Sequence, residues 1–243
     1  MILSQYYIYV NDKKLAISDN IDLFHLKTYG NDEFELILLQ SREITIFNDF
    51  KIRQEDLVTI SYYINNTCIC EFFGNIIEKE YTLTNCQKFS LLIKTSDEPP
   101  ITIMTILKEW AQGNDFLYWK NNKCKESKKL WLTACLYWQQ IFLPKSEKTI
   151  HVSLYLDGVS NYLDFFCMLG EAFFGKRGYI GKDFHGFDGL LSDLSYKKSE
   201  INIYTNNIKK LKLLLERISP PEHNYYDIFI DILINRNCNL IEK

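Results

Sequence analysis

The N-terminal part of the chain, up to about Leu92, alternates between short apolar runs and polar turns. Its runs are rich in β-branched and aromatic residues, which is typical of strands. Short polar connections between such runs favour antiparallel pairing. The sequence therefore predicts an antiparallel sheet or sandwich, with strands within Tyr6–Val10, Phe34–Leu39, Ile44–Phe47, Leu57–Ile64, Cys68–Phe73 and Phe89–Ile93.

The apolar positions recur at a longer period between Ile101 and Phe142, which indicates helices. All four tryptophans of the chain lie in this segment. Trp131, Cys135 and Trp138 share one side of a predicted helix. We interpret this stripe as core, with contact to a partner as the alternative.

A charged linker, Pro144–Lys148, is predicted before the pattern changes again. Alternating apolar residues then predict a strand over Ile150–Leu156. Ser160 is placed to cap a following helix, whose apolar residues recur every three or four positions. Asp183 is placed to cap a second helix, which is predicted to run through Leu194.

A second strand is predicted at Ile201–Thr205, followed by two helices on either side of Pro220-Pro221 and a last short strand at Cys238–Ile241. The resulting order, β-α-α-β-α-α-β, implies a three-stranded parallel sheet with helical crossovers. We therefore expect an α+β chain of two domains. The first is a β-rich domain with a helical extension at residues 1–145, and the second is an α/β domain at residues 149–243.

The charge balance changes the range of possible partners. The chain has 28 Lys and Arg against 31 Asp and Glu, a net charge of −3. Because there is no basic excess to hold a phosphate backbone, we expect no nucleic-acid binding. No apolar run reaches the roughly 18 to 20 residues that span a bilayer, and the first residues do not have the pattern of a signal peptide. We expect a cytoplasmic protein without membrane contact.

The residues that usually carry chemistry are scattered along the chain. None of the seven cysteines forms a Cys-x-x-Cys pair, and the four histidines are far apart in the sequence, so no metal or other cofactor is expected. The motifs of common nucleophilic, metal-dependent and phosphate-binding enzymes are absent. We therefore expect no catalysis. A set of His, Lys and Glu that meets only in the folded chain remains the enzymatic alternative.

Six of the ten glycines fall within twenty residues, from Gly170 to Gly189. The segment contains Leu169-Gly170-Glu171-Ala172, then Gly175 to Phe184 with a Gly-Tyr-Ile-Gly turn, and Leu190-Leu191 beyond. This pattern resembles that of the barstar family of barnase inhibitors, and the resemblance covers about Thr149 to Lys243. It implies a barstar-like α/β fold. It also implies an immunity protein that binds a cognate bacterial toxin, a ribonuclease or other nuclease, and blocks its active site.

Family inhibitors of this kind place carboxylates on a rigid helix, where they occupy the phosphate sites of a cationic cleft. The present chain departs from that pattern at three positions. Asp183 stands where the family has an asparagine, and His185 and Gly189 stand where the family has its first and second aspartates. Asp188 is one residue from the second position, which rotates its side chain by about 100°. Asp193 follows Gly189 by four residues and lies on nearly the same face.

Two alternatives remain for the toxin contact. Either the carboxylates have moved to Asp193 and Asp183, or the toxin differs from the family's usual ribonuclease. The resemblance implies the toxin-binding residues Tyr179, Gly181, Lys182, Asp183, His185, Gly189 and Asp193. From the residues alone, Gly178 and Gly181 meet a backbone requirement, Asp183 caps a helix and Asp188 is a solvated charge. The alternative function is a non-catalytic interaction module whose N-terminal domain makes the partner contact.

Overall fold

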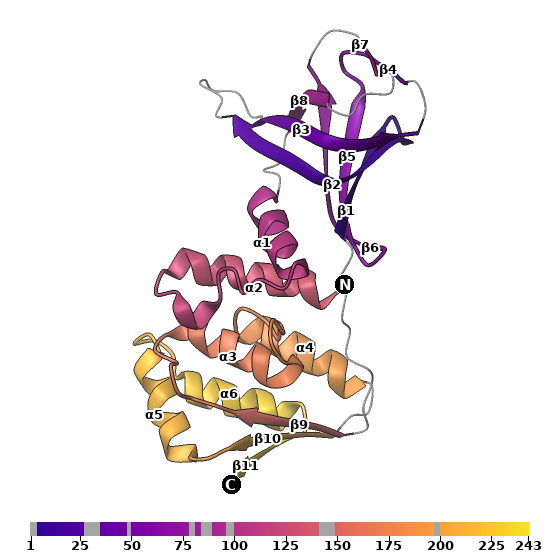
Figure 1. The fold of residues 1–243 in the computed structure, drawn as a ribbon. Coiled ribbons are helices and arrows are strands. Elements are labelled where there is room, and N and C mark those ends of the chain that lie inside the picture. Colours follow the sequence, from indigo (N-terminus) through magenta and orange to yellow (C-terminus); the bar gives the residue numbers. More distant parts are fainter. Residues whose placement is uncertain are drawn as a thin grey trace. The chain divides into compact units, whose positions relative to one another are not determined.

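The computed structural model describes residues 4–26, 35–47, 50–77, 81–83, 89–95, 100–140, 149–196 and 200–243. Its fold is mixed α/β (Figure 1). Contacts divide the chain into two compact units, Met1–Phe116 and Leu117–Lys243, which are called the first and second unit below. The second unit therefore begins ahead of the division near residue 145 that the sequence pattern suggested. The linker predicted at Pro144–Lys148 lies outside the described residues.

The first unit is built around a curled antiparallel sheet, as the alternating pattern predicted. Six of its strands follow the order β1-β2-β3-β8-β6-β5, and β5 pairs with β1, so that the sheet closes on itself. Two short strands, β4 and β7, pair separately. The elements are β1 Ser4–Val10, β2 Lys13–Leu26, β3 Glu35–Ile46, β4 Phe50–Ile52, β5 Leu57–Ile64, β6 Thr67–Ile76, β7 Tyr81–Leu83, β8 Phe89–Thr95 and the helix α1 Ile101–Ala111.

Buried and partly exposed side chains alternate along the strands of this sheet, and the buried ones fill its interior. In β1, Tyr6, Ile8 and Val10 are buried, whereas the residues between them are partly exposed. The paired strand β5 buries Tyr62, and the ring centroids of Tyr6 and Tyr62 lie 4.8 Å apart. Because successive side chains of a strand point to opposite faces, the same pattern that fills the interior leaves a second row outside.

The second unit has a three-stranded parallel sheet with β10 between β9 and β11. The observed order from β9 onward, β-α-α-β-α-α-β, confirms the prediction from periodicity. Its elements are the 3-10 turn η1 Trp119–Asn121, α2 Lys125–Gln139, β9 Thr149–Leu154, α3 Tyr162–Phe174, α4 Phe184–Tyr196, β10 Glu200–Thr205, α5 Ile208–Ile218, α6 Tyr225–Asn235 and β11 Cys238–Glu242. Figure 1 shows α3, α4 and α6 on the same side of this sheet.

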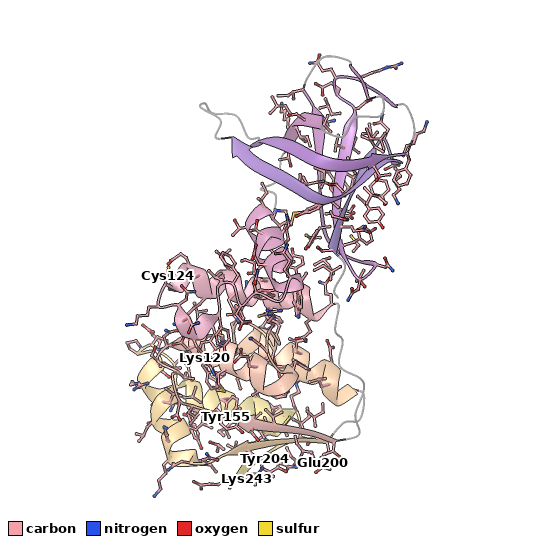
Figure 2. The ribbon with its side chains drawn as sticks, viewed as in Figure 1. Lys120, Cys124, Tyr155, Glu200, Tyr204 and Lys243 are labelled. Carbon is pink, nitrogen blue, oxygen red and sulfur yellow. The ribbon has the colours of Figure 1, made fainter. Side chains whose placement is uncertain are left out.

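The side of the sheet away from these helices is polar. Glu200, Tyr204 and Lys243 lie along it in Figure 2. Tyr204 alternates with the buried Ile203, accepts or donates a hydrogen bond at 3.1 Å with His151 Nδ1, and has the Lys243 ammonium 3.9 Å from its ring centroid. The apolar side chains of the strands therefore pack toward the helices.

Helix α2 packs against α3, and the side chains of all four tryptophans are buried, which confirms the core interpretation of the stripe. A buried ion pair joins the two helices, between the Lys128 ammonium and Asp164 Oδ1. The other carboxylate oxygen, Oδ2, accepts hydrogen bonds from the Ser160 backbone N–H, the Ser160 hydroxyl and the Asn161 side-chain amide. The N-cap of α3 is Asn161, whose Oδ1 accepts the Asp164 backbone N–H, so the prediction of Ser160 as the cap was wrong by one residue.

Candidate functional site

The glycine-rich loop between α3 and α4 is held closely by its surroundings. Gly170 and Gly178 let two backbone segments approach so closely that a Cβ at either position would overlap the other residue's carbonyl group. The Tyr179 backbone N–H donates to Gln139 Oε1, at 2.6 Å. The loop is thereby fixed to both α3 and α2, and the close approach expected at Gly178 is confirmed.

The end of this loop sets the start of α4. Gly181 has φ +109°, and a Cβ there would lie 2.5 Å from the backbone N of Phe187. Asp183 caps the helix, because its Oδ1 accepts the Gly186 N–H at 2.8 Å and its carbonyl accepts the Phe187 N–H at 2.9 Å. The backbone role of Gly181 and the capping role of Asp183 are therefore both confirmed.

Four of the predicted toxin-binding residues form an exposed ridge on and just before α4. These residues, called the α4 ridge below, are Lys182, His185, Gly189 and Asp193, and all four are exposed. His185, Gly189 and Asp193 are spaced by four residues, which places them on one side of the helix. A Cβ added at Gly189 would meet no atom within 4 Å, so the middle of the ridge is open.

The other three predicted site residues lie in the glycine loop or at the start of α4 and are buried or half-buried. Gly181 is buried, and Asp183 is half-buried with one carboxylate oxygen engaged as the helix cap. Tyr179 is also half-buried, and burial, followed by the Asp183 carboxylate, raises the pKa of its hydroxyl. The structure therefore separates the predicted set into four surface residues and three that shape the loop.

Asp188 is not the solvated charge that the sequence suggested. The Arg236 guanidinium donates to both of its carboxylate oxygens, at 2.7 Å each, and this pairing lowers the pKa of the Asp188 carboxyl. Arg236 also donates to the Ser192 hydroxyl at 3.2 Å. The prediction was wrong because Arg236 is distant in sequence. The expectation that Asp188 points about 100° away from Gly189 is consistent with this pairing, since Asp188 is turned toward Arg236 at the end of α6 and not along the ridge.

Helix α6 packs beside α4 through aromatic side chains. The rings of Phe184 and Tyr225 pack at 5.2 Å and those of Phe187 and Phe229 at 5.7 Å, so the two helices run side by side in the same direction. Asp227 and Asp231 are exposed and lie opposite the buried Phe229, whose ring faces Phe187 of α4. Both carboxylates therefore point away from α4 and are not part of the ridge. Sequence reasoning missed the packing of α6 against α4 because the residues that make it lie more than forty positions apart. The apolar stripe of each helix was the available signal.

A pocket of about 560 Å³ lies elsewhere in the second unit and contains titratable groups. The residues that line it include Tyr118, Lys120, His151, Ser153, Tyr155, Glu171 and Lys176. Figure 2 labels Lys120 and Tyr155. Glu171 Oε2 accepts the Tyr118 hydroxyl at 3.4 Å and lies 3.9 Å from the Lys120 ammonium. Burial raises the pKa of the Glu171 carboxyl. This is a set of Glu, Lys and His of the kind that the enzymatic alternative requires.

The outer face of the first unit carries exposed aromatic residues. The rings of Tyr7 and Tyr63 lie 4.5 Å apart, and the Lys14 ammonium lies 4.1 Å from the Tyr7 ring centroid and 4.8 Å from that of Phe47. Phe47 is 45% exposed and Phe73 is 51% exposed. We call these five residues the first-unit aromatic face. Exposed aromatic groups of this kind are typical of interaction surfaces.

Comparison with known proteins adds no family to these observations. No family model matches the chain, and no match was found among curated proteins or solved structures. Within the described ranges, no helix has the length and apolar character needed to cross a membrane. No group of three or more His, Cys, Asp or Glu side chains in the same ranges is arranged to hold a metal ion.

Proposed function

We propose that the second unit is a barstar-like immunity module that binds a cognate bacterial toxin, a ribonuclease or other nuclease, and blocks its active site without catalysing a reaction itself. The observation that carries this proposal is the exposed α4 ridge, which follows a tightly packed glycine loop. A surface that is rigid before binding loses little conformational entropy when a partner covers it. The sequence resemblance described above supports the same function, and the protein would act in the cytoplasm.

Charge indicates how such a ridge would meet a nuclease. Asp193 presents its carboxylate on the ridge. A nuclease cleft stabilises phosphate with cationic side chains, so carboxylates fixed on helices can occupy the same positions. Binding energy at such interfaces is concentrated in a few residues, and a desolvated charge pair can be one of them.

The two alternatives for the toxin contact can now be weighed. Asp183 uses one carboxylate oxygen as the helix cap, which leaves Asp193 as the better placed of the two substitutes. The rest of the ridge contributes Lys182, His185 and Gly189 rather than further acids. This mixed charge supports a toxin whose cleft differs from that of the family's usual ribonuclease.

The direct test compares two aspartates on α4 for binding to the cognate toxin that the proposal requires. We expect Asp193→Ala to weaken binding by more than about 1 kcal/mol, which is about fivefold in Kd. Asp188→Ala should change the affinity little, because Asp188 is paired with Arg236 within the molecule. Equal effects of the two substitutions would contradict the assignment of the ridge.

A second variant blocks the surface without disturbing the fold. Gly189→Trp adds a large side chain where nothing lies within 4 Å of the Cβ position. The variant should therefore keep its far-ultraviolet circular dichroism and thermal transition while losing the toxin. Toxin binding at wild-type affinity by a folded Gly189→Trp protein would show that the contact lies elsewhere.

The first-unit aromatic face favours the alternative of an interaction module whose N-terminal part makes the contact. Replacing Phe47 and Phe73 with serine removes the two most exposed of its rings. If the alternative holds, this double variant loses the partner and Gly189→Trp does not. Our proposal predicts the reverse.

The pocket of about 560 Å³ that contains Glu171 allows the enzymatic alternative to be tested. The proposal predicts that the purified chain does not turn over RNA. RNA cleavage that disappears in Glu171→Gln, while the variant keeps the circular dichroism of the folded protein, would contradict the non-catalytic assignment. Glutamine keeps the shape of the side chain but cannot exchange a proton at this position.

A further inference from the structure

A second pocket of the second unit, of about 690 Å³, is strongly basic. It lies where the segment that leads into α2, the start of α3, the end of α5 and the start of α6 meet. Its volume is within the range of small-molecule and cofactor sites. The residues that line it are Lys123, Lys125, Lys129, Ser160, Asn161, Tyr162, Leu163, Arg217, Ile218 and Tyr225.

None of the described residues that line the pocket is acidic, whereas four of them are cations. The nearby Asp164 carboxylate is buried and already neutralised by Lys128, so it does not balance them. Glu126 is the acid that acts on Lys125 and Lys129, and it does so from their own helix. Four positive charges around one pocket therefore favour an anion with more than one negative charge.

Aromatic rings give the pocket a second kind of recognition. The Tyr162 and Tyr225 rings pack against each other, with centroids 4.8 Å apart and planes inclined by 39°. Both tyrosines are only partly exposed and line the same pocket as the cations. A planar heterocycle can stack on such rings, and the interaction tolerates different bases.

We propose that this pocket binds a free nucleotide, with its phosphates held by Lys123, Lys125, Lys129 and Arg217 and its base against the two tyrosine rings. The proposal is independent of toxin binding, because the pocket contains none of the residues of the α4 ridge. A nucleotide in this position would contact α2, α3, α5 and α6 together. Bound ligand would therefore stabilise the second unit against unfolding.

Isothermal titration calorimetry on the full chain tests the proposal with ATP, inorganic triphosphate and adenosine as probes. We expect ATP to bind more tightly than triphosphate, and adenosine to bind most weakly. The double variant Lys125→Ala/Lys129→Ala should weaken ATP binding at least about tenfold, because two charged contacts are lost. The control Lys209→Ala/Lys212→Ala removes two exposed lysines of α5 outside the pocket and should bind ATP as the wild type does.

Three results would overturn the proposal. The first is the absence of binding by both ATP and triphosphate at millimolar concentration. The second is an equal loss of ATP affinity in the pocket variant and the control. The third is tighter binding of a short single-stranded oligonucleotide than of ATP, which would assign the basic surface to a nucleic-acid strand instead of a free nucleotide.

Discussion

The ion pair between Lys128 and Asp164 gives the sharpest stability prediction, because both side chains are almost fully buried, with exposures of 5% and 1%. Lys128→Met keeps most of the side-chain volume and removes only the charge. Asp164 Oδ1 then has no ammonium to face, while Oδ2 keeps its hydrogen bonds from Ser160 and Asn161. Leaving one partner of a buried ion pair uncompensated costs about 3 to 5 kcal/mol.

This loss is a large part of a typical unfolding free energy of about 5 to 15 kcal/mol. The assay is urea denaturation followed by tryptophan fluorescence, since Trp131 and Trp138 are buried on α2 and report its detachment. The matched control is Lys129→Met on the same helix, where the exposed side chain predicts a change within about 0.5 kcal/mol.

A double variant tests whether the uncompensated Asp164 charge causes the loss of stability in Lys128→Met. Adding Asp164→Asn to Lys128→Met removes the uncompensated charge and keeps an oxygen that can accept the hydrogen bonds from Ser160 and Asn161. The double variant should therefore be more stable than Lys128→Met alone. A loss below about 1 kcal/mol in Lys128→Met, or a double variant less stable than the single one, would refute the reasoning.

Three further predictions concern the second unit. Gly189→Ala should raise the unfolding free energy by about 1 kcal/mol, because alanine favours the helix and its Cβ meets no atom there. Gly181→Ala should lower the unfolding free energy by about 2 kcal/mol or more, because the backbone has a positive φ and lies close to Phe187. Chemical denaturation measures both changes. Because burial raises the pKa of Glu171 above its ordinary value of 4.5, folding favours the protonated form. Its stabilising contribution is present below that value and lost as the pH rises through the folded pKa, so wild type should lose stability relative to Glu171→Gln over that window in a denaturation series. A fragment of residues 117–243 should show a cooperative thermal transition, whereas a fragment of residues 149–243, which lacks α2, should not.

The order of elements in the second unit was predictable because it depends on local patterns. Strand alternation and helical periodicity are visible over short windows, and the glycine loop and the Asp183 cap follow from neighbouring residues. In the first unit the same holds for β1, β5, β6 and β8. The predictions missed β2, β4 and β7, and the runs predicted separately at 34–39 and 44–47 form the single strand β3. The closure of that sheet between β1 and β5 was not predictable, because nothing in either strand specifies its partner.

The parts of the site that sequence reasoning missed all depend on residues far apart in the chain. Arg236 neutralises Asp188 across more than forty positions, and the packing of α6 beside α4 joins Phe187 and Phe229, which are as far apart. The attachment of α2 to α3 through Lys128 likewise has no sequence motif. Deleting residues 1–145 to isolate the second part of the chain would therefore remove a helix that α3 needs.

The most direct measurement of the central claim is a structure of the full chain bound to the nuclease that the proposed function requires. The account predicts that Lys182, His185, Gly189 and Asp193 are covered by the nuclease and that the Asp193 carboxylate lies in its active-site cleft. A complex in which the four residues stay exposed to solvent, with the nuclease seated on the first-unit aromatic face or elsewhere, would contradict it.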